Sequence, residues 1–481
     1  MTRLRTARIG VVIFGVLVCA GLAAAIAVQP MLGLAATIGL AVAVVGLDIN
    51  RRLGLTNVAI MFVVSVLQPL NGIRPSSSVT IGDVGLCLLA GMSIPLLRRA
   101  RIETRLLVPF IGLMIITAAG FIGLIATNDW ALTASQDCLP NCTTGIGGAT
   151  KFILGAPGVM FIVFLIHPSP KVATVLARGY GLGSVITASA AAAGVHVDPV
   201  FLRAMGYSAH ELHLALSCLF TCILAIGWFI SATSWLPRLA AAGMGAICFY
   251  GMLLSGARSA LIGFTVACIL FAIVGRGRGI AAAAGGALAL VVGLAAALPF
   301  MPQGSTIYRL LGMGSTNSYT SASNGQHVQV FNQAIDLLSA HPWTGLGFGK
   351  GLFAHNLVLE ALSVGGPFAL VGFVIVWGTV LTAVIRMVQN GLRREEYLAA
   401  SMLIGVVGYI VLGQFENMIW DRHLWWYITL TLVALPPSAL LSPKAFRQAA
   451  SAQTAETGEP SAAKDPVPQH AGALEGSLSP A

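Results

Sequence analysis

Apolar runs of about 20 residues recur along most of this chain, and short polar connections separate them. A helix needs about 20 mainly apolar residues to cross a bilayer. Backbone in hydrocarbon must satisfy its own hydrogen bonds, so helices are favoured there. The pattern predicts an all-α, polytopic transmembrane bundle with about 12–14 spans. The expected spans are residues 8–28, 30–47, 53–70, 82–97, 106–126, 150–167, 172–194, 211–233, 239–256, 258–275, 280–300, 356–379, 397–415 and 423–441.

The charges fall in the connections between these runs. Only 9% of the 481 residues are charged, against about 25% in soluble domains. With the N-terminus inside, 20 of the 27 Lys and Arg residues lie on the inner side. This positive-inside pattern predicts a multi-pass protein of the plasma or inner membrane with both termini in the cytoplasm. It also accounts for the net charge of +10 without a nucleic-acid partner.

The domain organisation follows from the same pattern. We expect an integral membrane domain over residues 1–441 and a disordered cytoplasmic tail over residues 442–481, which is rich in Ala, Ser and Pro. The longest connection, residues 301–355, is expected on the outer side, with a mobile first half. Residues 327–342 have helical apolar spacing, which predicts an amphipathic helix on the membrane surface that ends at Pro342.

Cys138 and Cys142 lie in the expected outer loop DCLPNC. A disulfide between them and a pair of free thiols are both compatible with the sequence, because that compartment permits oxidation.

The segment SAHPWTGLGFGKGLFAHN, residues 339–356, directly precedes an apolar run of spanning length. Irregular backbone beside hydrocarbon is tolerated only where it packs in protein or lines a polar cavity. Histidine is the usual side chain for proton transfer near neutral pH. We therefore expect His355 to be catalytic and Asn356, beside it, to be an auxiliary residue, although a helix-capping role for the pair is the alternative.

Two arginines on the expected outer face are candidates for anion binding. Arg258, in LLSGARSALIGF, begins an apolar run, and Arg203, in FLRAMGYSAHELH, lies between two runs. The planar guanidinium donates two hydrogen bonds to phosphate oxygens, so such groups suit a diphosphate. Other outer residues that could assist are His327, Lys350, Arg309 and Arg422.

No metal site or cofactor is expected. The segment His210-Glu211-Leu212-His213 has the spacing H-E-x-H, which differs from the H-E-x-x-H that puts two zinc ligands on one helical face. A transporter is a weaker interpretation, because the sequence shows neither charged residues in mid-span nor two related halves.

Three segments together resemble the O-antigen ligase and polymerase superfamily. HPWTGLGFGKGLFAHN resembles its His-Pro…Gly-x-Gly…His-Asn loop, LLSGARSALIGF its Ser-Gly-x-Arg-x-Ala segment, and RAMGYSAHELHLAL its Arg-x-x-Gly segment. The resemblance covers residues 200–380, the ligase- or polymerase-like core. His327 and Phe331 stand where family members often carry an arginine followed by an aromatic residue.

The resemblance implies metal-independent glycosyl transfer with inversion at the sugar carbon. A preassembled glycan would move from a polyprenyl diphosphate to a hydroxyl of a glycan, a lipid core or another acceptor. Arg203 and Arg258 would bind the diphosphate, and His355 would orient or deprotonate the acceptor. We expect a ligase; a polysaccharide polymerase is the alternative, and the lipid bilayer is the remaining partner.

Overall fold

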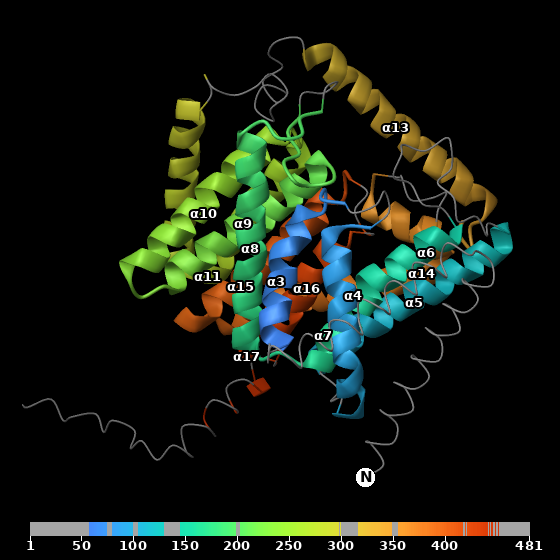
Figure 1. Cartoon of the computed structure of the whole chain (residues 1–481), viewed down its shortest axis with the longest axis horizontal. Coiled ribbons are helices and arrows are strands. Elements are labelled where there is room, and N and C mark those ends of the chain that lie inside the picture. Colours follow the sequence, from blue (N-terminus) through green and yellow to red (C-terminus); the bar gives the residue numbers. More distant parts are fainter. Residues whose placement is uncertain are drawn as a thin grey trace, which may run out of the picture.

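The computed structural model describes residues 57–74, 79–99, 104–128, 145–198, 203–297, 316–348, 355–416 and 421–440, together with a few isolated positions. Figure 1 shows a bundle of helices. The elements are α3 (Asn57–Leu67), η1 (Gln68–Leu70), α4 (Ile81–Ser93), η2 (Ile94–Arg99), α5 (Thr104–Thr127), α6 (Gly145–Ile153), η3 (Leu154–Gly158), α7 (Val159–Ile166), α8 (Pro170–Ala192), α9 (Glu211–Ser231), α10 (Trp235–Leu254), α11 (Arg258–Ala297), α13 (Thr316–Ala340), α14 (Leu357–Asn390), η5 (Arg394–Glu396), α15 (Tyr397–Leu412), α16 (Arg422–Ala434) and α17 (Pro437–Leu440).

The expected all-helical membrane fold is confirmed. Among the described residues, strand pairing is limited to one isolated antiparallel bridge between Val197 and Ala204. Seven helices in the described part of the chain are long and apolar enough to cross a membrane. They are Arg105–Thr127, Gly145–Ile166, Glu211–Ser231, Trp235–Leu254, Arg258–Gly277, Leu357–Asn390 and Arg394–Leu412.

Some expected boundaries are present in the structure, and others differ. The boundary expected between the spans 258–275 and 280–300 is present as a break at Arg276 within α11, where the backbone leaves helical geometry (φ 51°, ψ −137°), and the first part, Arg258–Gly277, is long enough to span by itself. The span expected at 423–441 is the shorter α16, followed by α17. The spans expected at 8–28 and 30–47 lie outside the described residues, as do Cys138, Cys142 and most of the expected tail. The division into membrane domain and tail stays a prediction.

The centre of the bundle is formed by α9, α15 and α16. Every residue of α16 from His423 to Ala434 is buried, including Trp425, Trp426 and Tyr427. The Tyr427 ring stacks on Phe220 of α9, with centroids 4.2 Å apart and planes 6° from parallel. In Figure 1, α16 lies between the other helices. Burial on all sides explains why this short helix is apolar around its whole circumference.

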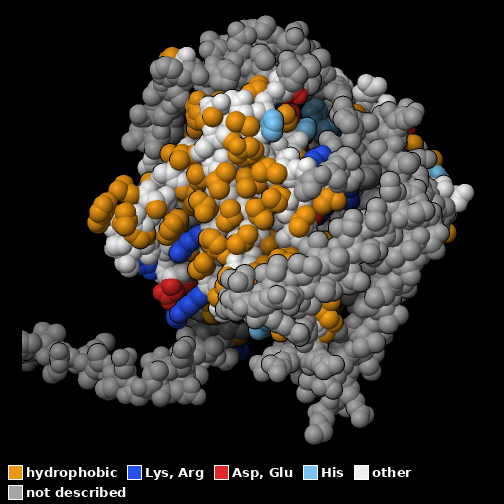
Figure 2. Space-filling model, in the orientation of Figure 1, with side chains coloured by type: hydrophobic (Ala, Val, Ile, Leu, Met, Phe, Trp, Pro, Cys, Tyr) orange, Lys and Arg blue, Asp and Glu red, His pale blue; other side chains and the backbone are white. Residues whose placement is uncertain are grey.

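The outer helices present apolar side chains to their surroundings. Ile262, Ile269 and Ile273 of α11 and Val371 and Val374 of α14 are exposed. The visible face in Figure 2 carries a broad hydrophobic surface, with charged side chains gathered toward its ends. An apolar surface of this extent fits contact with lipid.

The helices α5 and α14 cross closely because glycines face each other. A Cβ added to Gly372 would lie 2.4 Å from the carbonyl oxygen of Gly112, so neither position has room for a side chain. Small residues at a crossing let two backbones approach, as is common between membrane helices. This contact holds α14, and therefore its first residues, against the bundle.

The helix expected in the long connection is present but longer than expected. It is α13, which begins at Thr316, so residues 316–326 are helical where we expected a mobile segment. The sequence there contains no proline, and the helix is anchored further on, where Ala334 and Leu338 pack on Leu359 of α14. Figure 1 shows α13 running along the edge of the bundle. Val328, Phe331 and Ile335 remain exposed, as expected for a helix on a membrane surface.

Candidate functional site

The segment that carries Arg258 forms a tight turn between α10 and α11. The hydroxyl of Ser255 accepts a hydrogen bond from the Ala257 amide at 3.2 Å and donates to the Met252 carbonyl at 2.6 Å. Gly256 adopts a positive φ of 72°, which glycine tolerates readily. The turn makes Arg258 the first residue of α11, half-buried at the end of that helix.

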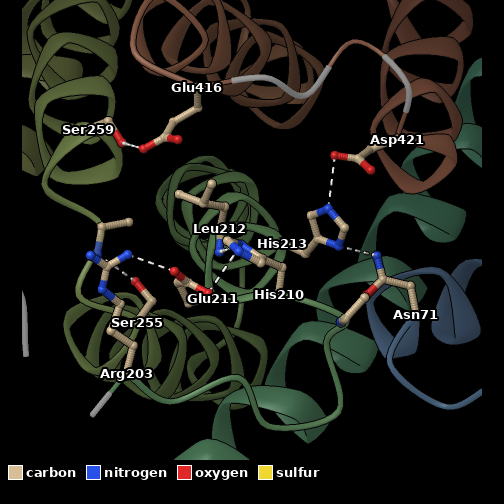
Figure 3. Close-up of polar contacts among 12 residues, drawn as sticks. Asn71, Arg203, His210, Glu211, Leu212, His213, Ser255, Ser259, Glu416 and Asp421 are labelled. Carbon is tan, nitrogen blue, oxygen red and sulfur yellow. Dashed lines mark hydrogen bonds and ion pairs between the residues drawn. The ribbon is translucent and has the colours of Figure 1, made fainter. Parts of the chain in front are cut away.

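Arg203 lies beside this turn. The amide of its neighbour Ala204 donates to the carbonyl of Leu254, the last residue of α10, at 3.1 Å. The Arg203 guanidinium donates to the Glu211 carboxylate at 2.7 Å, and Glu211 is buried at the start of α9 (Figure 3). The two arginine segments, 55 residues apart in the chain, are therefore joined at one end of the bundle.

Asn356 fixes the start of α14. Its side-chain oxygen accepts from the amides of Val358 and Leu359, both at 3.0 Å, and its nitrogen donates to Gln414. Asn356 is therefore a helix cap that also ties α14 to the connection after α15. Helix capping was the alternative role that the sequence suggested for His355 and Asn356, and Asn356 has that role.

His355 precedes this cap in a left-handed conformation, with φ 49°. Such a conformation is uncommon for a non-glycine residue and is often found at functional sites. Its Nδ1 is buried and lies 3.5 Å from Oε2 of Glu416, without hydrogen-bond geometry. Glu416 also accepts a hydrogen bond from the hydroxyl of Ser259 at 3.2 Å (Figure 3).

His327 of α13 completes the group. Its ring meets the His355 ring edge to face, with centroids 4.2 Å apart. Burial lowers the pKa of His327, the charges of His355, Arg203 and Arg258 lower it further, and Glu416 opposes them. The imidazole is therefore neutral at pH 7. We call His327, His355, Glu416 and Ser259 the His355 cluster; both arginines lie within electrostatic reach of it.

The glycine-rich segment before His355 is largely a docking element. The amides of Leu346 and Gly347 donate to the carbonyls of Ser363 and Val364, at 2.6 and 3.0 Å. These carbonyls stand next to the break in α14 at Gly365 and Gly366. A Cβ on Gly366 would lie 2.3 Å from the Trp343 carbonyl oxygen, so the close approach requires glycine.

Phe348 ends this docked segment in the core. It is fully buried and packs on Phe121 and Phe152, with ring centroids 6.0 and 5.5 Å away. The docked segment therefore holds α13 and α14 in place on either side of it, which positions His327 against His355.

Of the other expected auxiliary residues, Arg422 is not in the His355 cluster. Arg422 forms an ion pair with Asp83 of α4 and lies against Gly155 of η3, so it joins these elements to α16. Lys350 and Arg309 lie outside the described residues.

A second group of polar residues surrounds Asn71, after η1. The Asn71 side-chain oxygen accepts from the Ala209 amide at 2.8 Å. This bond fixes the amide orientation, so its nitrogen donates to Nδ1 of His213 (2.9 Å) and Nδ1 of His423 (3.2 Å). We call Asn71, His213, His423 and Asp421 the Asn71 cluster.

Both imidazoles of the Asn71 cluster must carry their proton on Nε2, because Nδ1 accepts. His213 then donates from Nε2 to Oδ2 of Asp421 at 3.0 Å (Figure 3). Burial raises the pKa of Asp421, but His213 and His423 outweigh burial, so the pKa is lowered and the carboxylate stays charged.

Two groups among the described residues have ligand atoms within 4.8 Å of one another, as a metal ion needs: His213, Asp421 and His423, and His327, His355 and Glu416. In the first group, the tautomers fixed by Asn71 place protons on both Nε2 atoms, which disfavours ligation. His210 is separate from both groups: it caps α9 by accepting from the Leu212 amide at 3.3 Å. Burial lowers the pKa of His210, although Glu211 opposes this effect.

Glu416 and Ser259 are site residues that sequence reasoning missed, and Glu211 was considered only as a metal ligand. A signal for Glu416 existed, because a carboxylate directly after an apolar run is unusual in a chain with only 17 acidic residues. Its partners could not be inferred, because Ser259 lies 157 residues away.

Part of the chain matches a known protein family. Residues 243–374 match a family model described as O-antigen ligase. No match was found among curated proteins. The matched region runs from α10 into α14 and contains Arg258, His327 and His355. This match supports the resemblance to the O-antigen ligase superfamily, and the apolar spanning helices indicate an integral membrane protein.

Proposed function

We propose that this protein is a membrane glycosyltransferase that moves a preassembled glycan from a polyprenyl diphosphate to an acceptor hydroxyl on the outer face of the plasma or inner membrane. One observation carries the proposal: His355, His327 and Glu416 gather in one cluster, within electrostatic reach of Arg203 and Arg258. The site therefore offers a possible base, a carboxylate to orient it and two cations at one end of a lipid-embedded bundle.

The chemistry assigns a task to each group. The acceptor oxygen attacks the anomeric carbon, the bond from that carbon to the diphosphate oxygen breaks, and the acceptor proton passes to His355. Arg203 and Arg258 stabilise the charge that develops on the leaving diphosphate. Glu416, 3.5 Å from Nδ1, would stabilise the imidazolium and fix the orientation of the ring. Attack opposite the leaving group inverts the anomeric centre.

The arginine assignment predicts how Arg258 variants bind donor. Arg258→Ala should weaken binding of the lipid-linked donor by about 10-fold to 10²-fold and reduce turnover as well. Arg258→Lys should restore little, because an ammonium cannot reproduce the bidentate fork. Donor affinity and single-turnover transfer would be measured on purified variants with wild-type melting behaviour. Unchanged donor affinity in Arg258→Ala would reduce this arginine to an interfacial anchor.

The decisive experiment offers purified protein a defined polyprenyl-diphosphate oligosaccharide with two kinds of acceptor. Transfer to a lipid-core or other surface hydroxyl is expected of the ligase that we propose, and extension of a second lipid-linked glycan would indicate a polymerase. Transfer should persist in excess EDTA. Loss of transfer under EDTA that added metal restores would refute the metal-independent mechanism and turn attention to His327, His355 and Glu416 as ligands.

The outer location of residues 301–355 and the cytoplasmic location of both termini belong to the same proposal, supported by the distribution of Lys and Arg. A single cysteine at position 321 should react with an impermeant reagent in intact cells. Labelling only after permeabilisation would contradict the orientation and the catalytic assignment with it.

A further inference from the structure

A cavity of about 540 Å³ lies where α11 breaks and α14 ends. Its lining includes Arg276, Arg393, Asn390 and Tyr397. Arg276 follows Arg258 by 18 residues of helix, which corresponds to about 27 Å of rise. Likewise, Asn390 stands at the opposite end of α14 from the cap at Asn356. The cavity is therefore at the far end of the spanning helices from the His355 cluster.

The arginines at the end of the bundle that contains the cavity make two kinds of contact. Arg105, Arg386 and Arg394 donate to the backbone carbonyls of Val433, Leu440 and Ala232, at 2.7, 2.6 and 2.7 Å. Such bonds satisfy the last carbonyls of helices, as basic side chains often do. Arg276 and Arg393 are exposed and line the cavity; Arg276 also donates to the Val388 carbonyl over 3.5 Å, and Arg393 interacts electrostatically with Glu396.

The backbone that presents Arg276 is strained. An arginine with φ 51° and ψ −137° occupies a region that glycine prefers, and strain of this kind tends to persist at functional sites. The neighbouring wall is fixed, since the Tyr397 hydroxyl donates to the Gly275 carbonyl at 3.0 Å. Of the two nearby carboxylates, Glu396 is buried and accepts from the Arg393 amide at 2.8 Å, while Glu395 is exposed. Arg276 and Arg393 thus line a polar recess with room for an anion.

The surfaces next to the cavity are apolar. Ile269 and Ile273 of α11 and Leu381 and Ile385 of α14 are exposed and precede the cavity residues along their helices. If Arg276 and Arg393 bind the anionic group of a ligand, the rest of that ligand lies beside this apolar surface. We propose that the cavity binds the phosphodiester headgroup of an anionic phospholipid, with the acyl chains lying along α11 and α14. Basic pockets between membrane helices are suited to such headgroups.

The test uses the full-length protein, delipidated in a neutral detergent. Short-chain phosphatidylglycerol is the probe, and binding is measured by native mass spectrometry and by thermal stabilisation. Short-chain phosphatidylcholine and inorganic phosphate serve as comparison ligands. We expect phosphatidylglycerol to bind and stabilise the protein, and the other two to do neither at the same concentration.

Two variants locate the site. Arg276→Gly removes the charge and relaxes the strained backbone, because glycine accepts positive φ, so the variant should fold at least as well. Combined with Arg393→Gln, it should lower the affinity for phosphatidylglycerol at least about tenfold. Lys171→Gln, which removes one exposed charge at the same end of the bundle, is the matched control and should bind as wild type.

Three results would overturn the proposal. Equal stabilisation by phosphatidylcholine would mean that the effect comes from acyl chains alone. Equal stabilisation by inorganic phosphate would identify a soluble anion as the ligand. Undiminished phosphatidylglycerol binding by the double variant would place the lipid elsewhere on the protein.

Discussion

Figure 3 shows parts of two polar clusters on either side of the start of α9: Glu416 and Ser259 of the His355 cluster, and Asn71, His213 and Asp421 of the Asn71 cluster. Both clusters contain two histidines and a carboxylate. In the Asn71 cluster, one amide uses its oxygen and its nitrogen to hold Ala209, His213 and His423, and His213 also donates to Asp421. In the His355 cluster, Nδ1 of His355 is buried without a well-aligned hydrogen bond, on a backbone with positive φ.

This difference separates structural roles from chemical ones. Polar networks whose bonds are formed fix the position of helices. A buried polar group that lacks a hydrogen-bond partner costs free energy, unless a bound molecule supplies the missing hydrogen bond. Both imidazoles of the Asn71 cluster have their Nδ1 bonded to Asn71, and Nε2 of His423 is left unpaired. We propose that this cluster is part of the scaffold and that substrate binds at the His355 cluster.

The largest expected effect is on His355. His355→Ala should reduce transfer by about 10²-fold to 10⁴-fold, because it removes the group that takes the acceptor proton. Lipid-linked donor should still bind, since the arginines are unchanged. Single-turnover transfer and donor affinity would be measured in parallel. Wild-type transfer by a well-folded His355→Ala protein would show that the His355 cluster has no chemical role that the Asn71 cluster lacks.

A smaller effect is expected for Glu416. Glu416→Gln keeps the shape and the acceptor for Ser259 but removes the charge that faces His355. We expect turnover to fall by about 10-fold to 10²-fold, with donor affinity unchanged. Wild-type turnover by a well-folded Glu416→Gln protein, or a loss of donor affinity, would contradict this role of the carboxylate.

For the Asn71 cluster, the expected effect is on stability. Asn71→Ala leaves the Ala209 amide and both Nδ1 atoms without their partner, which should cost about 1–3 kcal/mol. The melting temperature in detergent should fall by several degrees, while transfer per folded molecule stays near wild type. Thr174→Ala, which removes an exposed hydroxyl bonded only to the Lys171 carbonyl, is the control. Loss of transfer at unchanged stability would assign a chemical role to this cluster.

The smallest effect concerns His327 and pH. Its pKa lies below 6.5 in the folded protein, so the neutral ring adds stability above that pH, and this stability is lost as the pH falls through the lowered value. His327→Gln cannot take up the proton, so its melting temperature should decline less than that of wild type between pH about 6.5 and 5, by about 1–2 °C. Identical pH dependence of the two proteins would show that His327 does not titrate in this range.

Much of the architecture could be predicted because it depends on local properties of the chain. Apolar runs of spanning length predicted the helices α5, α9 and α10 within a few residues of their bounds. The break in α11 lies at Arg276, inside the charged connection that separates the two expected spans, so the sequence did carry this signal. The break in α14 at Gly365 and Gly366, just before Pro367, was missed because it lies within an apolar run of spanning length.

For the site, the sequence by itself determined which residue types were available: a histidine before a helix cap, two arginines at helix ends and a glycine-rich segment between two helices. Only the tertiary structure decided their partners. It set His327 against His355, paired Glu416 with Ser259 across 157 residues, and directed Arg422 to Asp83. The physical reason is that periodicity and composition govern how each helix forms, whereas contacts between helix ends depend on where close crossings such as Gly112 with Gly372 bring the backbones together.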